Sequence, residues 1–169
     1  MSIRILGALI VISGCGWFGF SMAGAHRARE RLFRQMIRAA EYMACELGYR
    51  QTPLPQLCRN TSRVLDRGLR PIFLHLADLL EESCFADVAA CMDAVLEENE
   101  LVPTARALME ELGRTLGQFD LNGQLRSLTA FQADCEASLK ELSRNRDNRL
   151  RSYQTLGLCT GAALAVLLL

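Results

Sequence analysis

Long uncharged stretches at both ends constrain the fold of this chain most strongly. Residues 5–25 are 21 consecutive uncharged residues, and residues 152–169 are 18 more. As α-helices these stretches would be about 31 Å and about 27 Å long, which approaches the thickness of the hydrocarbon core of a bilayer. The sequence therefore predicts a transmembrane helix over residues 1–25, a second over residues 152–169, and a separate domain over residues 26–151.

The basic residues beside the two stretches predict their orientation. Each stretch has a basic cluster on the side that faces the middle of the chain, and positively charged flanks of a span stay in the cytoplasm. The clusters are His26, Arg27, Arg29, Arg31 and Arg34 after the first stretch, and Lys140, Arg144, Arg146, Arg149 and Arg151 before the second. We therefore expect a cytoplasmic middle domain, with both termini outside the membrane.

A cleaved signal peptide is the alternative interpretation of the N-terminal stretch. Arg4 precedes the apolar run, and the sequence Ala23-Gly24-Ala25 resembles a cleavage site. The chain would then be an exported helical protein that only its C-terminal stretch anchors in the membrane. The arginines that follow Ala25 oppose export, and they favour the arrangement with two spans.

Apolar residues between the spans recur at steps of three and four, which is the pattern of amphipathic helices. The expected helices run from the first span to Gly48, from the turn at residues 49–55 to Gly68, from Pro71 onward, over residues 85–98, up to Gly117, and from Asp120 to Leu169. The sequence thus predicts an all-α bundle of about six helices, of which the first and last continue into the membrane.

Several polar residues have the chemistry of helix ends. Thr52 and Asp120 are suited to be N-caps, and Pro53 is suited to the first helical position. Thr104 can cap the fifth helix in the same way. Gln124, four residues after Asp120, can satisfy backbone groups near that cap.

Pairs of glycines four residues apart predict close helix contacts. Gly113 and Gly117 are expected to allow close packing on one helix face. Gly157 and Gly161 have the same spacing within the second predicted span, where small residues let membrane helices approach each other.

The sequence contains no recognisable arrangement of catalytic or metal-binding residues. Its seven cysteines are an odd number without a CxxC motif, which disfavours a disulfide framework or a zinc site and favours small buried thiols. His26 and His75 have no partner at metal-ligand spacing, and neither a phosphate-binding glycine motif nor a nucleophile motif occurs. We therefore expect no enzyme activity, no cofactor, no metal and no small-molecule substrate.

The charges are balanced overall but separated along the chain. A net charge of zero argues against a general nucleic-acid binder. Residues 26–70 hold ten arginines and four acids, whereas residues 71–111 hold ten acids and one arginine. We expect the basic part to lie near anionic lipids and the acidic part away from them.

The acidic helices are also a candidate docking surface, because complementary charge speeds and orients association. The candidate residues are Glu81, Glu82, Glu97, Glu98, Glu100, Glu110 and Glu111. The simpler interpretation is that acid is kept away from an anionic membrane. A further alternative is a membrane-bound regulator that holds a basic partner through these helices.

Several short motifs in order resemble those of one known family. They are GFSMA at residues 19–23, Arg34-Gln35, Glu46, Tyr49, Thr52-Pro53-Leu54, LGRTLGQFDLNGQ at residues 112–124 with Gly113, Leu116, Gly117, Asp120 and Gln124, and Leu156-Gly157 with Gly161. With these motifs the chain resembles the stage III sporulation protein AB family along its whole length. The scarcity of lysine and the seven cysteines depart from the family without touching the motifs.

The resemblance implies a role in endospore-forming bacteria. Proteins of this family lie in the mother-cell membrane around the forespore, and they belong to the channel complex between the two cells. The cytoplasmic domain would be similar to the six-helix F domain of the type II secretion platform. The implied partners are a secretion-type ATPase, stage III sporulation protein AA, and other subunits of the complex.

Overall fold

The computed structural model describes residues 27–82 and 87–168, and of residues 145–168 it describes the helical backbone without the side chains. Every regular element within these residues is an α-helix, as predicted. The elements are the first helix over residues 27–50, α2 (Leu54–Val64), α3 (Arg70–Glu82), α4 (Val88–Glu97), α5 (Pro103–Thr115) and α6 (Leu121–Leu168).

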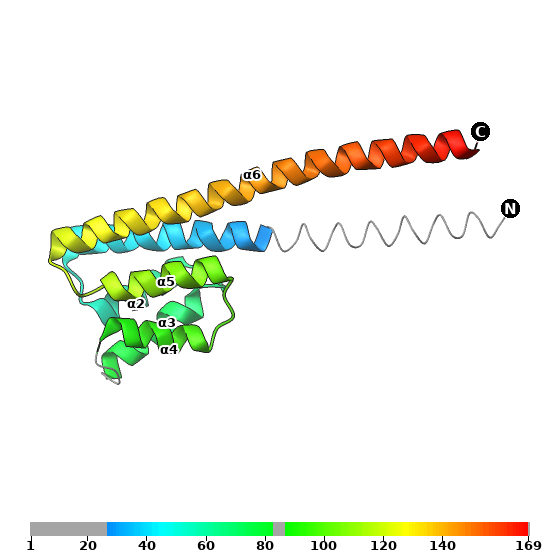
Figure 1. Cartoon of the computed structure of the whole chain (residues 1–169). Coiled ribbons are helices and arrows are strands. Elements are labelled where there is room, and N and C mark those ends of the chain that lie inside the picture. The colour runs from blue at the N-terminus through cyan, green and yellow to red at the C-terminus, as the bar shows by residue number, and fades with distance from the viewer. Residues whose placement is uncertain (1–26, 83–86, 169) are drawn as a thin grey trace.

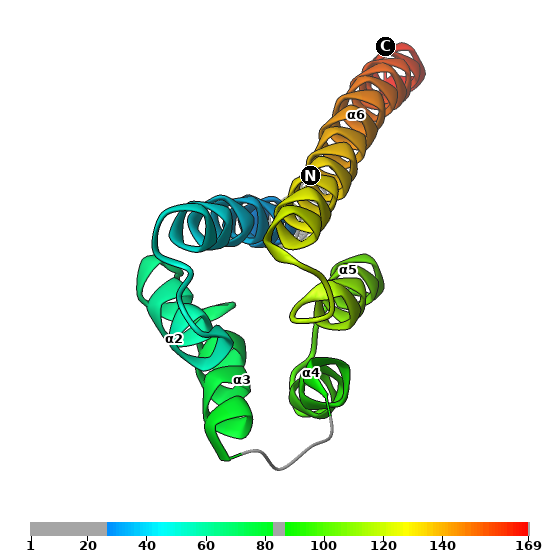
Figure 2. The same cartoon turned by 90° about the vertical axis from the view of Figure 1, so that its left-hand side faces the viewer.

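The helices form a ring in chain order. Figure 2 shows the first helix, α2, α3, α4, α5 and α6 following one another around the bundle, with α6 returning beside the first helix. Contacts join α2 to α3, α3 to α4, α4 to α5, and α5 to α6. Short connections between sequence neighbours produce this order, since consecutive elements usually pack against each other.

The ring encloses one hydrophobic core to which all the helices contribute. The first helix buries Phe33, Met36, Ala40, Met43 and Leu47, which recur at the predicted steps of three and four residues. The largest fully buried side chains are Phe73, Met36, Met43, Leu57, Leu69, Ile72, Leu76, Met92, Leu96, Met109, Leu112 and Leu116. Because each such side chain stabilises the fold by about 1.5–3 kcal/mol when buried, the core rather than the helix propensities holds the bundle together.

α6 is much longer than α2 to α5. It has 48 residues, against 10 to 13 for α2 to α5. Its N-terminal part packs on the core through the buried side chains of Leu128, Phe131 and Cys135. Beyond the bundle α6 continues as one helix, and it leaves at the end where the first helix begins (Figure 1).

The two predicted spans stay predictions. Residues 1–25 lie outside the described part of the chain, while residues 152–168, with Gly157 and Gly161, continue the backbone of α6. Within the described residues, no helix combines the length and the hydropathy that a membrane crossing needs.

Several predicted helix ends differ from the structure. α2 ends at Val64 instead of Gly68, because Leu65 adopts an extended conformation with ψ of 149°. α5 begins at Pro103, and its N-cap is Val102, so Thr104 lies inside the helix and does not cap it. α4 begins at Val88, where the carboxylate of Asp87 accepts a hydrogen bond from the backbone N–H of Ala90 at 2.7 Å.

Candidate functional site

Two groups of the family motifs, residues 46–54 and residues 112–124, lie at one end of the bundle, which we call the loop end. The other motifs lie on the first helix, on the distal part of α6, or outside the described residues. The loop end consists of residues 49–53, which follow the first helix, and residues 116–120, which precede α6. Figure 1 shows both connections at the end of the bundle opposite to the one where α6 leaves it, and Figure 2 views the molecule from this end.

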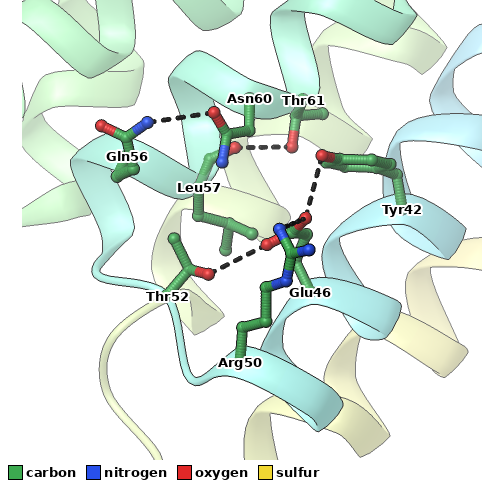
Figure 3. Close-up of polar contacts among 8 residues, drawn as sticks. All are labelled: Tyr42, Glu46, Arg50, Thr52, Gln56, Leu57, Asn60 and Thr61. Carbon is green, nitrogen blue, oxygen red and sulfur yellow. Dashed lines mark hydrogen bonds and ion pairs between the residues drawn. The ribbon is translucent and has the colours of Figure 1, made fainter.

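The Glu46 carboxylate organises the first connection of the loop end (Figure 3). Its Oε1 accepts a hydrogen bond from the hydroxyl of Tyr42 at 3.0 Å and pairs with Arg50 at 3.5 Å, and its Oε2 accepts one from the hydroxyl of Thr52 at 3.0 Å. The Glu46 side chain is 11% exposed, so these contacts are partly shielded from water. Partial burial, and then the neighbouring Glu46, raise the pKa of Tyr42, which therefore stays a hydrogen-bond donor.

Thr52 and Pro53 do not have the roles that the sequence predicted. The N-cap of α2 is Pro53, whose carbonyl accepts a hydrogen bond from the N–H of Leu57 at 2.8 Å. The hydroxyl of Thr52 is directed to Glu46 instead of to α2. A carboxylate is the stronger acceptor, because hydrogen bonds to a charged group are about twice as strong as those between neutral groups.

Asp120 and Gln124 organise the second connection. Asp120 Oδ1 accepts a hydrogen bond from the N–H of Gly123 at 3.0 Å, which is the geometry of the predicted N-cap of α6. Gln124 Nε2 donates to the carbonyl of Phe119 at 3.0 Å, so its amide satisfies a nearby backbone group. A Cβ at Gly123 would lie 2.6 Å from the Cβ of Phe119, a restriction that the sequence analysis missed.

Gly113 and Gly117 both lie at close contacts, but they do not share a helix face as predicted. A Cβ at Gly113 would lie 2.6 Å from the Cβ of Met92, so this glycine lets α5 approach α4. Gly117 follows α5 with a φ of 80°, a left-handed conformation that ends the helix. A Cβ at Gly117 would lie 2.8 Å from Leu54 Cδ1, and the neighbouring Leu116 is buried in the core.

The seven candidate acidic residues do not form one patch. α3 ends where α4 begins, so Glu81 and Glu82 are separated from Glu97, Glu98 and Glu100 by the length of α4, which is about 15 Å for ten residues. Figure 1 shows the C-terminal end of α4 on the side of the bundle where the first helix begins. The expectation that the acidic helices lie together, away from that side, is therefore not met.

Ion pairs within the bundle engage several of the same carboxylates. They join Glu81 to Arg59 at 2.7 Å, Glu110 to Arg106 at 2.9 Å and Glu111 to Arg114 at 3.4 Å. A carboxylate oxygen of Glu98 also lies 3.4 Å from His75 Nδ1. His75 is partly exposed, as expected for a surface position. These carboxylates contribute to contacts inside the protein, which weakens the case that all seven act together on a partner.

Burial divides the described cysteines into two groups. Cys58, Cys91 and Cys135 are buried small side chains, as predicted, whereas Cys45 is exposed and Cys84 lies outside the described residues. Burial raises the pKa of both Cys58 and Cys135 to about 12, so these thiols stay protonated. Among the residues that the structure describes, no group of three or more side chains is placed to hold a metal ion.

Three residues have an exposure or a contact that the sequence did not predict. Tyr49 is 88% exposed and Phe119 is 51% exposed, one on each connection of the loop end. Gln35 is buried in the first helix, and its Nε2 donates to Asp66 Oδ2 at 3.2 Å in the turn between α2 and α3. Phe119 belongs to no apolar stripe of the sequence, and this isolated position could have identified it as an exposed aromatic residue.

Comparisons with known proteins agree on one family. A model of the family described as stage III sporulation protein AB matches residues 4–169. The stage III sporulation protein AB of Bacillus subtilis (strain 168) is 24% identical over 170 residues, with 99% of each chain covered. A solved structure of stage III sporulation protein AB shares the fold with a TM-score of 0.63 and 21% identity, covering 72% of this chain and 98% of that one.

The family match includes every motif at the loop end, together with α6 and the first helix. Because it extends over nearly the whole sequence, it applies to the complete bundle rather than to one of its elements. The chain belongs to the stage III sporulation protein AB family.

Proposed function

We propose that this chain is a non-enzymatic platform subunit of the channel complex between mother cell and forespore. Residues 1–25 and 152–169 cross the mother-cell membrane around the forespore, residues 26–151 form the cytoplasmic bundle, and both termini lie outside. The bundle holds the secretion-type ATPase of this complex, stage III sporulation protein AA. Membership of the sporulation family supports a role within a complex.

The observation that carries the proposal is the position of the two helix ends. The first helix begins and α6 leaves the bundle at the same end, beside each other (Figure 1). A chain that enters and leaves a membrane as a hairpin requires this arrangement. Arg27, Arg29 and Arg31 are exposed at this end, where anionic headgroups would attract them.

Labelling of Cys45 tests the orientation. Cys45 is exposed, whereas Cys58, Cys91 and Cys135 are buried, so a membrane-impermeant maleimide reports on Cys45 in the folded bundle. We expect labelling after permeabilisation of the cells and none before it, with a Cys45→Ser variant as the control for other thiols. Labelling of Cys45 in intact cells, together with loss of residues 1–25, would instead establish the exported protein with a cleaved signal peptide.

Co-purification tests the partner. The full chain, extracted in mild detergent from cells that also produce stage III sporulation protein AA, is expected to retain that ATPase on an affinity column. An unrelated membrane protein with the same tag serves as the control. Equal recovery of the ATPase with both proteins contradicts the proposal.

A further inference from the structure

We propose that copies of this chain associate side by side in the membrane, with the basic side of one bundle against the acidic side of the next. The basic side consists of exposed arginines on the first helix and around the α2–α3 turn, namely Arg38, Arg63, Arg67 and Arg70. The acidic side consists of exposed carboxylates on α4 and on its connection to α5, namely Asp93, Glu97, Glu98 and Glu100. This inference rests on the proposed function, because the two spans hold every copy upright in one orientation.

One contact brings the arginines of the basic side together. Gln35 Nε2 donates to Asp66 Oδ2 at 3.2 Å, so this face of the first helix adjoins the turn between α2 and α3. Arg38 follows Gln35 by three residues and therefore lies on the same part of the helix surface. The other arginines lie in the last turn of α2, in the α2–α3 turn and at the first residue of α3. Arginines from three consecutive elements thus share one side of the bundle.

Few carboxylates offset the charge of the basic side. Asp66 lies among the four arginines, and Glu41 is exposed on the first helix. Arg59 engages the carboxylates of α3 nearest to this side, which are Asp78 and Glu81. Among the described residues, no ion pair involves any of the four arginines. The basic side therefore keeps a net positive charge, to which the exposed Arg31 adds.

The carboxylates of the acidic side are also exposed and mostly unpaired. Asp93 and Glu97 lie four residues apart on α4 and so share one face of that helix. Glu98 and Glu100 follow at its end, and His75 Nδ1 lies 3.4 Å from Glu98. In the part of the chain that the structure describes, the other three carboxylates take part in no ion pair.

The arginines near the acidic side have other carboxylates beside them. Arg106 donates to the carbonyl of Leu96 at 2.9 Å and pairs with Glu110 at 2.9 Å. Arg29 and Glu141 line the same cleft, of about 220 Å³, beside the start of α5. Neither arginine offsets the four carboxylates, so the acidic side keeps a net negative charge.

The two sides lie at nearly the same height above the membrane. Gln35 marks the level of the α2–α3 turn through its contact with Asp66. Phe33 marks the level of the α4–α5 connection, because it lines one cleft with Val102 and Pro103. Phe33 and Gln35 are two residues apart, which is about 3 Å along the first helix. A neighbouring upright copy therefore presents its acidic side level with the basic side.

The two sides face in different directions. α3 contacts both α2 and α4, and Figure 2 shows α2 and α4 on opposite sides of the bundle. A two-fold dimer needs a surface that is complementary to itself, and neither a basic nor an acidic side is. The arrangement suits head-to-tail association, in which each copy uses its basic side on one neighbour and its acidic side on the other.

Anionic lipid does not account for both sides. It would attract the arginines but repel the carboxylates, which lie at nearly the same height. Arg38 also lies eleven residues after Arg27, which is about 16 Å along the first helix. Salt screens charge over about 8 Å at physiological ionic strength, so headgroups at the start of this helix act weakly on Arg38. A second copy offers a complementary charge to both sides.

Energy transfer between copies in a membrane tests the inference. The full chain carries a donor or an acceptor dye on a terminal peptide tag, and it is reconstituted at low density in vesicles of phosphatidylcholine, which has no net charge. We expect transfer between unchanged copies. Transfer should fall at high salt, because exposed ion pairs are individually weak and are screened.

Charge reversal supplies the decisive comparison. Arg67→Glu/Arg70→Glu makes both sides acidic, and Asp93→Arg/Glu97→Arg/Glu100→Arg makes both sides basic. Each variant alone is expected to lower transfer at least fivefold. A mixture of the two variants is expected to restore it, because every acidic side can then meet a basic one.

Reversal at the loop end is the matched control. Arg114→Glu/Arg126→Glu makes the same change of charge on exposed arginines at that end and is expected to leave transfer unchanged. All variants should unfold at nearly the same temperature as the unchanged chain, which excludes misfolding as the cause. An equal loss of transfer in this control would assign the effect to net charge and overturn the inference.

Two further results would overturn the inference. One is transfer that survives reversal of either side, or that the mixture fails to restore. The other is transfer that is absent in phosphatidylcholine and appears only when phosphatidylglycerol is added, which would show that the arginines bind anionic lipid.

The outcomes separate this inference from the proposed function. If unchanged copies show no transfer but still retain the ATPase, the side-by-side association is overturned and the platform role stands. If the chain does not insert into the vesicles, the two spans are lost and both proposals are overturned.

Discussion

The hydroxyl of Thr52 donates a hydrogen bond to Glu46 Oε2 at 3.0 Å, and this contact joins the turn before α2 to the end of the first helix. Tyr42 and Arg50 contact the other oxygen of the same carboxylate (Figure 3). One side chain thus sets the direction in which the chain leaves the first helix. The turn at the loop end depends on Glu46 more than on any cap of α2.

Replacement of Thr52 by valine is expected to lower the free energy of unfolding by about 1 kcal/mol, the typical contribution of one hydrogen bond. Glu46→Ala should cost more, because it leaves Tyr42, Arg50 and Thr52 without their acceptor. Thermal or urea unfolding of the full chain in detergent measures both effects. Glu41→Ala is the control, since Glu41 is an exposed carboxylate on the same helix; equal losses for Glu41→Ala and Glu46→Ala would contradict this role.

The cap of α6 provides the second prediction. Asp120→Ala removes the acceptor for the N–H of Gly123 and should cost about 1 kcal/mol of stability, whereas Asp120→Asn keeps an acceptor and should cost less. Asp87→Ala is expected to cost a similar amount, because Asp87 caps α4 in the same way. The unfolding curves of the three variants test this. An Asp120→Ala variant as stable as the parent would refute the assignment.

The path of the helices was predictable from the sequence because each one buries a single stripe of apolar residues. Met36, Ala40, Met43 and Leu47 recur at helical spacing and all lie in the core. The helix ends were less predictable, because a cap depends on what else its side chain can reach. Thr52 has the chemistry of an N-cap, but its acceptor is supplied by the first helix, and local sequence contains no signal for that contact.

The candidate site was predictable in part. The motif around Gly117 and Asp120 lies at one end of the bundle, which the sequence pattern alone did not show. The acidic residues were grouped by their positions in the sequence, but the hairpin of α3 and α4 places Glu81 and Glu97 at opposite ends of α4. Proximity along the chain does not imply proximity in a bundle of antiparallel helices.

Replacement of Gly113 by alanine is expected to destabilise the protein by about 1–3 kcal/mol, the usual cost of overpacking a core. The added methyl group would lie 2.6 Å from the Cβ of Met92, so α4 and α5 would have to move apart. Gly68→Ala is the matched control, because no atom lies within 4 Å of a Cβ at that position. Equal unfolding midpoints for the two variants would show that the contact between α4 and α5 is looser than the structure indicates.

The cysteines provide a prediction about reactivity and pH. The pKa of Cys58 and that of Cys135 are raised to about 12 by burial, so at pH 8 both thiols are expected to resist alkylation while the exposed Cys45 reacts. The raised pKa values also determine how the stability of the fold changes with pH. The unfolded thiols ionise near pH 9 and the folded ones do not, so their stabilising effect is complete below pH 9 and is lost as the pH rises toward 12. Resistance to alkylation is measured by mass spectrometry of the chain, digested after a short pulse of iodoacetamide with and without urea. The pH dependence of stability is measured by urea unfolding at pH 8 and pH 10. Rapid alkylation of Cys58 without urea would contradict its burial in the core, because the bundle must open before the reagent can reach α2.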